Sequence, residues 1–165
     1  MPIITLETRI KSDIETCFDL SRSIDLHQIS TPGTHEKAIA GVTSGLIELG
    51  ETVTWEARHL GMLQQLTSRI TAMNRPFHFR DEQVKGVFRS IIHDHFLEQH
   101  GDTVIMKDSF RFETPCGFLG KVFNTIFLKR YLTKLLSERN NIIRDYAENG
   151  KSYFILNIPK SQTHD

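Results

Sequence analysis

The pattern of hydrophobic and polar positions between Gly117 and Glu148 predicts one long amphipathic helix. At about 1.5 Å per residue this helix is about 48 Å long, so it must cross the whole domain and pack along an extended partner. In one interpretation, residues 117–124 form a separate short helix or lid at its start. The charged residues, Arg139 among them, are assigned to a solvated face. The apolar stripe comprises Leu119, Val122, Phe123, Ile126, Phe127, Tyr131, Leu132, Leu135, Ile142, Ile143 and Tyr146.

The first residues of the chain alternate between apolar and polar, which predicts a half-buried strand over residues 3–10. Ser12, with Glu15 three residues later, has the form of a capping box and predicts the start of a short helix. A second short helix is predicted from Ser21 to Ile29. The chain therefore opens with a strand and two helices.

Helical periodicity disappears between His35 and Glu113, where short alternating runs are separated by turn residues. Gly61 marks a predicted bulge, and Gly101 with Asp102 forms a predicted tight turn. Because these strands follow one another without intervening helices, the predicted class is α+β, with an antiparallel sheet of six to seven strands. The predicted strands after the first span residues 37–42, 52–59, 65–73, 77–83, 87–97 and 103–113.

Residues 149–165 are predicted to form an extension to a single domain that spans residues 1–148. A short β-like run covers Tyr153 to Ile158, and Pro159 ends it; it is interpreted either as an ordered extra strand or as a loosely attached tail. The last residues, Ser161 to Asp165, are predicted to be disordered.

Composition and charge narrow the classes of function. Lys plus Arg and Asp plus Glu each total 20 among 165 residues, so no net charge attracts nucleic acid or an anionic membrane. Cys17 and Cys116 stand far apart without metal-binding spacing, which favours reduced thiols and a cytoplasmic location. The N-terminus lacks the pattern of a secretory signal, and basic residues interrupt the most apolar stretch, 118–136, which argues against membrane insertion.

Four stretches carry a resemblance to known proteins: CFDLSRSIDLH (17–27), AIAGVTSGLIELGETVTWEARHLG (38–61), RPFHFRDEQVKGVFRSIIHDHF (75–96) and DSFRFETPCGFLG (108–120). They resemble the START/Bet v 1-like superfamily, specifically its bacterial polyketide cyclase/dehydrase and lipid-transport-like group, the SRPBCC proteins. The element order is similar to that of the helix-grip fold. The resemblance implies a curved antiparallel sheet wrapped around the last helix, with a cavity between them for a small or medium apolar molecule. It supplies no catalytic signature that maps onto this chain residue by residue.

If the sheet grips the helix, alternation predicts which side chains face the cavity. On the strand at 52–59 the inward set is Trp55, Ala57 and His59. Two alternatives stay open for the next-to-last strand, which turns inward either Val87, Arg89, Ile91, His93 and His95 or Phe88, Ser90, Ile92, Asp94 and Phe96. On the last strand Asp108 belongs to the more apolar row, where an aspartate needs a partner such as histidine.

The candidate chemistry is a polar cluster of His59, His93, His95 and Asp108 in an otherwise apolar cavity. Histidines two apart on a strand point the same way, about 6.6 Å apart along the chain, and chelate zinc when a third ligand comes from a neighbouring strand. A second alternative is general acid–base catalysis on a polyketide-like substrate. The preferred interpretation is hydrogen bonding within the pocket wall or exposure to solvent, so neither a metal nor a cofactor is predicted.

The leading functional hypothesis is binding of a small or medium hydrophobic ligand, lipid-like or polyketide-like, between the sheet and the last helix. Arg89, if it shares the inward face with His93, would hold a carboxylate or phosphate of that ligand. The alternatives are a cyclase or dehydratase that uses the His/Asp cluster, and a protein–protein interaction module with a filled core. The predicted ligand-binding residues are Trp55, Ala57, Met73, Arg89, Val104, Met106, Phe110, Phe112, Phe123, Phe127 and Tyr131.

Overall fold

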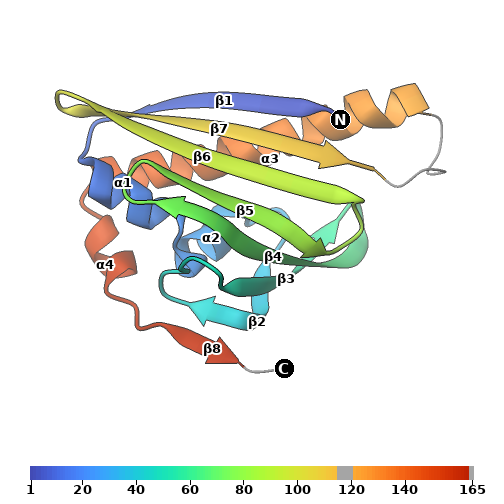
Figure 1. Ribbon diagram of the computed structural model, residues 1–165, viewed down its shortest axis with the longest axis horizontal. Helices are drawn as coiled ribbons and strands as arrows, with labels where there is room; N and C mark the ends of the chain where they lie inside the picture. The colour runs from blue at the N-terminus through green and yellow to red at the C-terminus, as the bar shows by residue number, and fades with distance from the viewer. Residues whose placement is uncertain (115–120, 164–165) are drawn as a thin grey trace.

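Within the described part of the chain, an antiparallel sheet of eight strands forms one layer, and helices lie against one of its faces (Figure 1). The computed structural model describes residues 1–114 and 121–163, with the backbone alone described at 121–125. Strands and helices are segregated along the chain, so the predicted α+β class and helix-grip arrangement are confirmed. The elements are β1 (Ile3–Ile10), α1 (Ile14–Ser21), α2 (Ile24–Ser30), β2 (Lys37–Ser44), β3 (Thr52–His59), β4 (Met62–Asn74), β5 (His78–Lys85), β6 (Ser90–His100), β7 (Thr103–Glu113), α3 (Lys121–Glu148), α4 (Ser152–Leu156) and β8 (Ser161–Thr163).

The strands lie in the order β1-β7-β6-β5-β4-β3-β2-β8, so the first strand of the chain pairs with the last strand of the meander. β6 and β7 form a long hairpin around the predicted turn at Gly101, whose φ of 60° suits glycine. Their register places His95 opposite Asp108 and His93 opposite Phe110. The register therefore brings residues far apart in sequence to one place on the inner face.

The connection between β3 and β4 corrects the bulge predicted at Gly61. Leu60 and Gly61 form a two-residue turn between His59 and Met62, which pair directly. Both turn residues have positive φ, 52° at Leu60 and 80° at Gly61. This backbone conformation matches the twist of a tight hairpin, so the glycine marks a turn between two alternating runs.

Asp13, not Ser12, caps helix α1. Its Oδ1 accepts a hydrogen bond from the backbone N–H of Thr16 at 2.8 Å, and its Oδ2 accepts one from Thr16 Oγ1 at 2.7 Å. The carboxylate also lies at the positive end of the helix dipole, which stabilises it further. α2 begins in the same way, because Ser23 Oγ accepts from the backbone N–H of Leu26 at 3.2 Å.

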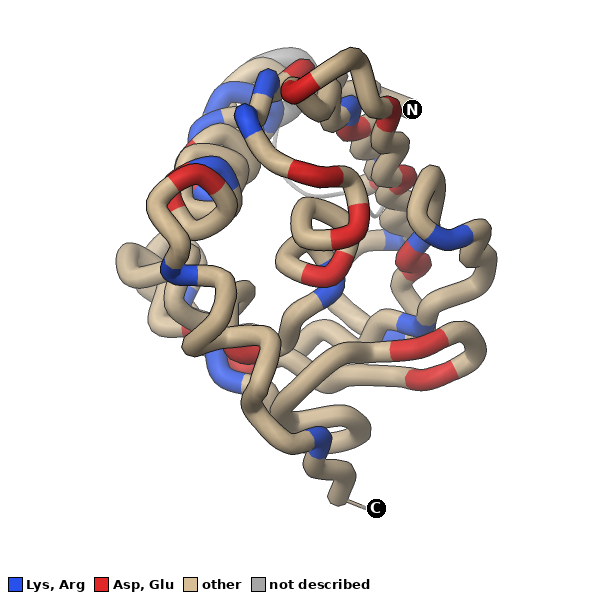
Figure 2. Tube along the Cα trace, turned by 90° about the vertical axis from the view of Figure 1, so that its left-hand side faces the viewer, with Lys and Arg blue, Asp and Glu red and all other residues tan. Residues whose placement is uncertain are grey.

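α3 spans 28 residues and runs behind β1, β7 and β6 in Figure 1. Leu136 and Ile143 are buried on its sheet-facing side, whereas Ile126 and Phe127 are exposed. The predicted long helix is confirmed from Lys121 onward, and the predicted lid at 117–124 lies largely outside the described residues. Charged residues of both signs are distributed over helices and strands in Figure 2. None of the helices described is long and apolar enough to cross a bilayer.

The C-terminal extension differs from its prediction in two ways. The run at 153–158 is not a strand, because Ser152–Leu156 forms helix α4, which buries Ile155 and exposes its aromatic residues. In a run this short, the periodicity of apolar residues does not distinguish a strand from a helix. Residues 161–163 are not disordered, because β8 pairs with β2 and Glu51 accepts hydrogen bonds from Lys160 and Gln162. This long-range pairing also supplies the eighth strand.

The outer face of β6 carries Asp94, whose side chain is only 4% exposed. Asp94 accepts hydrogen bonds from Arg80 Nε at 2.7 Å, His78 Nε2 at 2.8 Å and Arg111 Nη2 at 2.9 Å. Burial alone would raise the pKa of Asp94, but hydrogen bonds from Arg80 and His78 lower it to about 2. Because β6 places Asp94 outward, its histidine-bearing face points inward.

Asp94→Asn is expected to lower the free energy of unfolding by about 2.5 kcal/mol at neutral pH. The pKa of Asp94 falls from 3.8 to about 2 on folding, so the carboxylate stabilises the fold above about pH 4 and loses this effect as the pH falls toward 2. The difference between the native protein and the variant should shrink to about half at pH 3. Urea denaturation at pH 7, 4 and 3 measures it, and a difference that stays constant would contradict the role of the charge.

Candidate functional site

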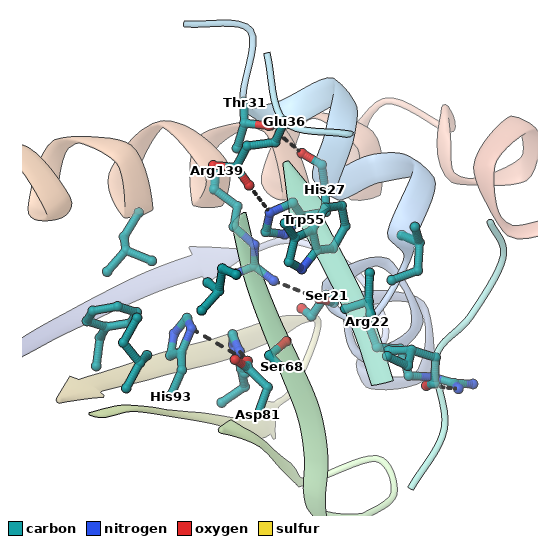
Figure 3. A pocket seen from close by; sticks show the side chains of 18 of the residues that line it. Ser21, Arg22, His27, Thr31, Glu36, Trp55, Ser68, Asp81, His93 and Arg139 are labelled. Carbon is teal, nitrogen blue, oxygen red and sulfur yellow. Dashed lines mark hydrogen bonds and ion pairs between the residues drawn. The ribbon is translucent and has the colours of Figure 1, made fainter. Parts of the chain in front are cut away.

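A cavity of about 190 Å³ lies between the inner face of the sheet and helices α2 and α3. Figure 3 shows side chains from both layers around it, among them His27 and Arg139 from the helices and Trp55, Asp81 and His93 from the strands. Every second residue of a strand faces inward. Most of these inward-facing residues are apolar, and the cavity wall is therefore mostly apolar. The apolar lining residues are Ile24, Ile47, Val53, Trp55, Leu66, Ile70, Phe79, Phe88, Ile91, Phe110, Leu132, Leu135 and Leu136.

Strands β5, β6 and β7 bring together Asp81, His93, His95 and Asp108, here called the inner cluster. His93 Nε2 is hydrogen-bonded to Asp108 Oδ1 at 2.9 Å. His95 Nδ1 lies 2.9 Å from the same oxygen but off the line of a hydrogen bond, while His95 Nε2 is hydrogen-bonded to Asp81 Oδ2 at 3.3 Å. His93 Nδ1 lies 3.8 Å from Asp81 Oδ2. The two histidines therefore lie between two carboxylates.

Burial and mutual contact set the charges in the inner cluster. Burial alone would raise the pKa of Asp108 and of Asp81, but contact with the histidines holds the pKa of Asp108 well below its usual range and lowers that of Asp81. Burial and the neighbouring His95 lower the pKa of His93. Burial opposes a charge on His95 as well, but contacts with Asp108 and Asp81 raise its pKa. His95 is therefore the more readily protonated histidine of the pair.

Two residues of α3 reach the inner cluster from the helix side. Asn140 Nδ2 donates to Asp108 Oδ2 at 2.6 Å and to Thr8 Oγ1 at 3.2 Å. Arg139 is 6% exposed, and its Nη2 donates to the carbonyl oxygen of Ser21 at 2.7 Å. Arg139 Nη1 lies 4.0 Å from Asp108 Oδ1 and has no hydrogen-bond partner among the described residues. A guanidinium donor is therefore available beside the cavity.

A second polar group, here called the outer cluster, consists of His27, Glu36, His59 and Tyr131. His27 Nε2 lies 2.6 Å from Glu36 Oε2, and His59 Nδ1 lies 3.0 Å from the Tyr131 hydroxyl. The ring of Trp55 stacks on His27 with centroids 4.1 Å apart. Burial lowers the pKa of His59; burial alone would raise the pKa of Glu36, but the charge of His27 and its hydrogen bond lower it. The cavity thus has hydrogen-bonding groups at two places along an apolar wall.

The structure brings five of the predicted site residues to the cavity wall: Trp55, His59, His93, His95 and Phe110. Asp108 lies directly behind the two histidines of β6, and Ala57 lines a smaller adjoining pocket with Trp55. Tyr131 reaches the outer cluster through His59. The role of these residues in binding or catalysis stays a prediction.

Other predicted residues lie elsewhere. Arg89 does not face the cavity, because its strand begins only at Ser90 and its side chain, 62% exposed, pairs with Glu113 at 3.2 Å. Phe127 is 47% exposed, and the side chain of Phe123 is outside the described residues. The remaining predicted residues pack within the core or against it: Met73, Val104, Met106 and Phe112.

Sequence reasoning missed His27, Glu36, Asp81, Arg139 and Asn140. Alternation on β5 contained a signal for Asp81, because it lies two residues after the buried Phe79. Arg139 was assigned to the solvated face, but it follows Leu132, Leu135 and Leu136 at helical spacing and is buried on the stripe. Glu36 precedes β2, and only tertiary structure brings it to His27 and His59.

The sheet, the gripped helix and the cavity define the fold of START and Bet v 1-like proteins, as the sequence resemblance implied. A START superfamily protein from Mycobacterium smegmatis is similar with a TM-score of 0.67 and 9% identity, over 89% of this chain and 97% of that chain. Ginseng major latex-like protein 151 from Panax ginseng is similar with a TM-score of 0.62 and 17% identity, over 88% and 97% of the respective chains. Identities this low show the fold alone.

A third solved structure with this fold is the di-domain ARO/CYC protein StfQ from the steffimycin biosynthetic pathway. It has a TM-score of 0.67 and 8% identity, and the similarity covers 90% of this chain and 52% of that chain. The sequence matches no protein-family model, and no curated protein matches it at a significant level.

Proposed function

We propose that the protein binds a small, largely hydrophobic molecule that carries a polar group, in the cavity between the sheet and α3. The observation that carries this proposal is an apolar cavity with buried hydrogen-bonding groups directed at it, above all Arg139 Nη1, which has no hydrogen-bond partner among the described residues. A buried donor without a partner is costly unless a ligand or water satisfies it. The START and Bet v 1-like proteins that share this fold support ligand binding as the class of function proposed for this chain.

The volume of the cavity limits the size of the ligand. About 190 Å³ is somewhat more than an engineered apolar cavity of about 150 Å³ that accommodates benzene. A single-ring aromatic or a short aliphatic molecule therefore fits without rearrangement. A longer lipid-like or polyketide-like molecule requires side chains at the wall to move.

Native mass spectrometry of protein purified without added ligand tests the proposal. A co-purified organic mass at one per chain, or a raised thermal midpoint with members of a panel of aromatic and aliphatic acids, alcohols and ketones, is the expected result. An empty protein whose thermal midpoint ignores the whole panel would contradict the proposal.

Ser68→Leu is expected to weaken binding of a panel ligand by about tenfold or more, because the added atoms occupy the cavity. Ser68 lies on the inner face of β4 and lines the cavity. Since the new side chain fills apolar space, the thermal midpoint of the ligand-free variant should not fall. Isothermal titration measures the affinity.

The matched control is Thr71→Leu, the same kind of change on the outer, exposed face of the same strand. It should leave the affinity unchanged. Equal affinity for both variants and the native protein would place the ligand outside this cavity.

A second candidate function is catalysis of the cyclase or dehydratase type, favoured by the contact of neutral His93 with Asp108 at the cavity wall. A neutral buried imidazole oriented by a carboxylate is a suitable general base. Incubation of a bound panel ligand with the protein, followed by mass spectrometry and NMR of the released molecule, separates the two functions. A dehydratase lowers the mass by one water and a cyclase changes the NMR spectrum even at constant mass, whereas a binding protein returns its ligand unaltered. The third hypothesis, a protein–protein interaction module, required a core filled by side chains, whereas the core contains a cavity.

A further inference from the structure

The inner cluster places three side chains of the types that ligate metals on one side of the cavity. Asp81, His93 and His95 each offer a ligand atom, and these atoms all lie within 4.8 Å of one another. Asp81 Oδ2 lies 3.3 Å from His95 Nε2 and 3.8 Å from His93 Nδ1. A tetrahedral ion with bonds of about 2.0 to 2.1 Å separates its ligand atoms by about 3.3 to 3.4 Å. Both measured separations therefore come within about 0.5 Å of that spacing.

The other nitrogen atoms of the two rings lie close to a shared carboxylate, and that of His93 is hydrogen-bonded to it. His93 Nε2 and His95 Nδ1 each lie 2.9 Å from Asp108 Oδ1. A metal-ligating histidine almost always directs its second N–H to a carboxylate, carbonyl or water, which fixes the ring. Asn140 in turn holds Asp108 through a hydrogen bond of 2.6 Å. Asp108, held by Asn140, thus supplies the supporting partner of His93 and lies 2.9 Å from the corresponding nitrogen of His95.

We infer that Asp81, His93 and His95 bind a divalent first-row transition-metal ion, with two imidazoles and one carboxylate as its protein ligands. This ligand set suits zinc and iron(II), and it leaves coordination positions open. The open positions face the cavity, because all three ligands line its wall. The inference goes beyond the proposed function, since metal binding is measurable without any organic ligand.

Charge and hydrogen bonding both favour a cation here. Metal coordination requires neutral imidazoles, and in that state the carboxylates of Asp81 and Asp108 outnumber the guanidinium of Arg139, so the group around the ion carries one excess negative charge. The hydrogen bond to Asp108 explains the orientation of the His93 ring without any metal, but His95 Nδ1 has no well-directed hydrogen-bond partner among the described residues. An ion that draws His95 Nε2 toward Asp81 and His93 fixes that ring through coordination as well.

Titration with Co(II) tests the inference on tag-free, full-length protein from which metals have been removed with EDTA. One equivalent is expected to bind with the visible absorption of a low-symmetry nitrogen and oxygen site. Competition by Zn(II), and by Fe(II) without oxygen, then distinguishes the two ions, and elemental analysis of the freshly purified protein identifies the one carried.

His93→Ala and Asp81→Asn are expected to weaken Co(II) binding by about a hundredfold, and Asp108→Asn by about tenfold to a hundredfold through its supporting role. His100→Ala is the matched control, because His100 lies on the same strand but is exposed beside Glu98. It should bind Co(II) like the native protein. Circular dichroism identifies any variant that fails to fold, and Asp81→Asn, which keeps the shape of its side chain, serves where His93→Ala unfolds.

Folded native protein that takes up neither Co(II) nor Zn(II) at millimolar concentration would overturn the inference. So would uptake that Asp81→Asn and His93→Ala both leave unchanged, because the ion would then be bound elsewhere. Neither outcome affects the proposed ligand binding, because the panel of organic ligands is repeated on EDTA-treated protein and its result there does not depend on a bound metal.

Discussion

Asp108→Ala is expected to lower the free energy of unfolding by about 3 to 5 kcal/mol, the usual effect of removing one partner from a buried charge network. The carboxylate is 1% exposed and lies 2.9 Å from a nitrogen atom of both His93 and His95. It also accepts the hydrogen bond from Asn140 at 2.6 Å. The substitution leaves three buried polar side chains, His93, His95 and Asn140, without their common partner.

Urea denaturation of Asp108→Ala at neutral pH measures this loss, with Asp102→Asn on the exposed β6–β7 turn as the control that should not change the midpoint. The folded-state pKa of Asp108 lies well below its usual range. The native protein should therefore lose this contribution as the pH falls below about 4, the ordinary pKa of an aspartate, toward the folded value. A variant as stable as the native protein at pH 7 would show that the network contributes nothing to the fold.

Much of the fold was predictable because it depends on local patterns. The alternation of β1, β3 and β7 and the stripe of α3 each follow from side-chain period alone. Where a short segment depends on a distant partner, the local pattern failed: α4 and β8 are fixed by packing and by pairing with β2. Gly61 was assigned to a bulge for another reason, because the first turn position is Leu60 and not the Asn, Asp or Gly that usually marks a two-residue turn.

The candidate site was predictable only in part, for a geometric reason. An alternating strand pattern does not tell which of its two faces points to the cavity. Only the hydrogen bonds of Arg80, His78 and Arg111 to Asp94 showed that Asp94 lies on the outer face and His93 on the inner one. Partners across the sheet depend on register, which set Asp81 beside His93 and Asp108 beside His95. The burial of a charged residue in the apolar stripe of a helix contradicts composition rules, so Arg139 was assigned to solvent.

The inner cluster, with the neighbouring Arg139, brings together negative and positive groups that lie far apart in the sequence. Its carboxylates come from β5 and β7, its histidines from β6, and its positive charge from α3. A buried arginine there offsets the two carboxylates when no cation is bound. The same arginine opposes a bound cation, so stability and metal affinity should respond to it in opposite directions.

Arg139→Met is expected to lower the free energy of unfolding of the metal-free protein by about 3 kcal/mol, because it leaves the buried carboxylate of Asp108 and the half-buried one of Asp81 without a nearby guanidinium. It is also expected to strengthen Co(II) binding by about tenfold or more, because a positive charge near the ion is removed. Denaturation with EDTA and titration with Co(II) measure the two effects on one preparation. Arg144→Met, on the exposed face of the same helix, is the control and should change neither.

The double variant Asp81→Asn with Arg139→Met locates the cause of the instability. If Arg139 stabilises the fold by offsetting carboxylate charge, its removal should cost less free energy once Asp81 is neutral, since less uncompensated charge is left buried. An equal cost in both backgrounds would assign the effect to Asp108 or to the hydrogen bond that Arg139 donates to Ser21, and not to Asp81. Weaker Co(II) binding by Arg139→Met would contradict the placement of the ion beside the guanidinium, because the loss of a positive charge at that place strengthens the binding of a cation.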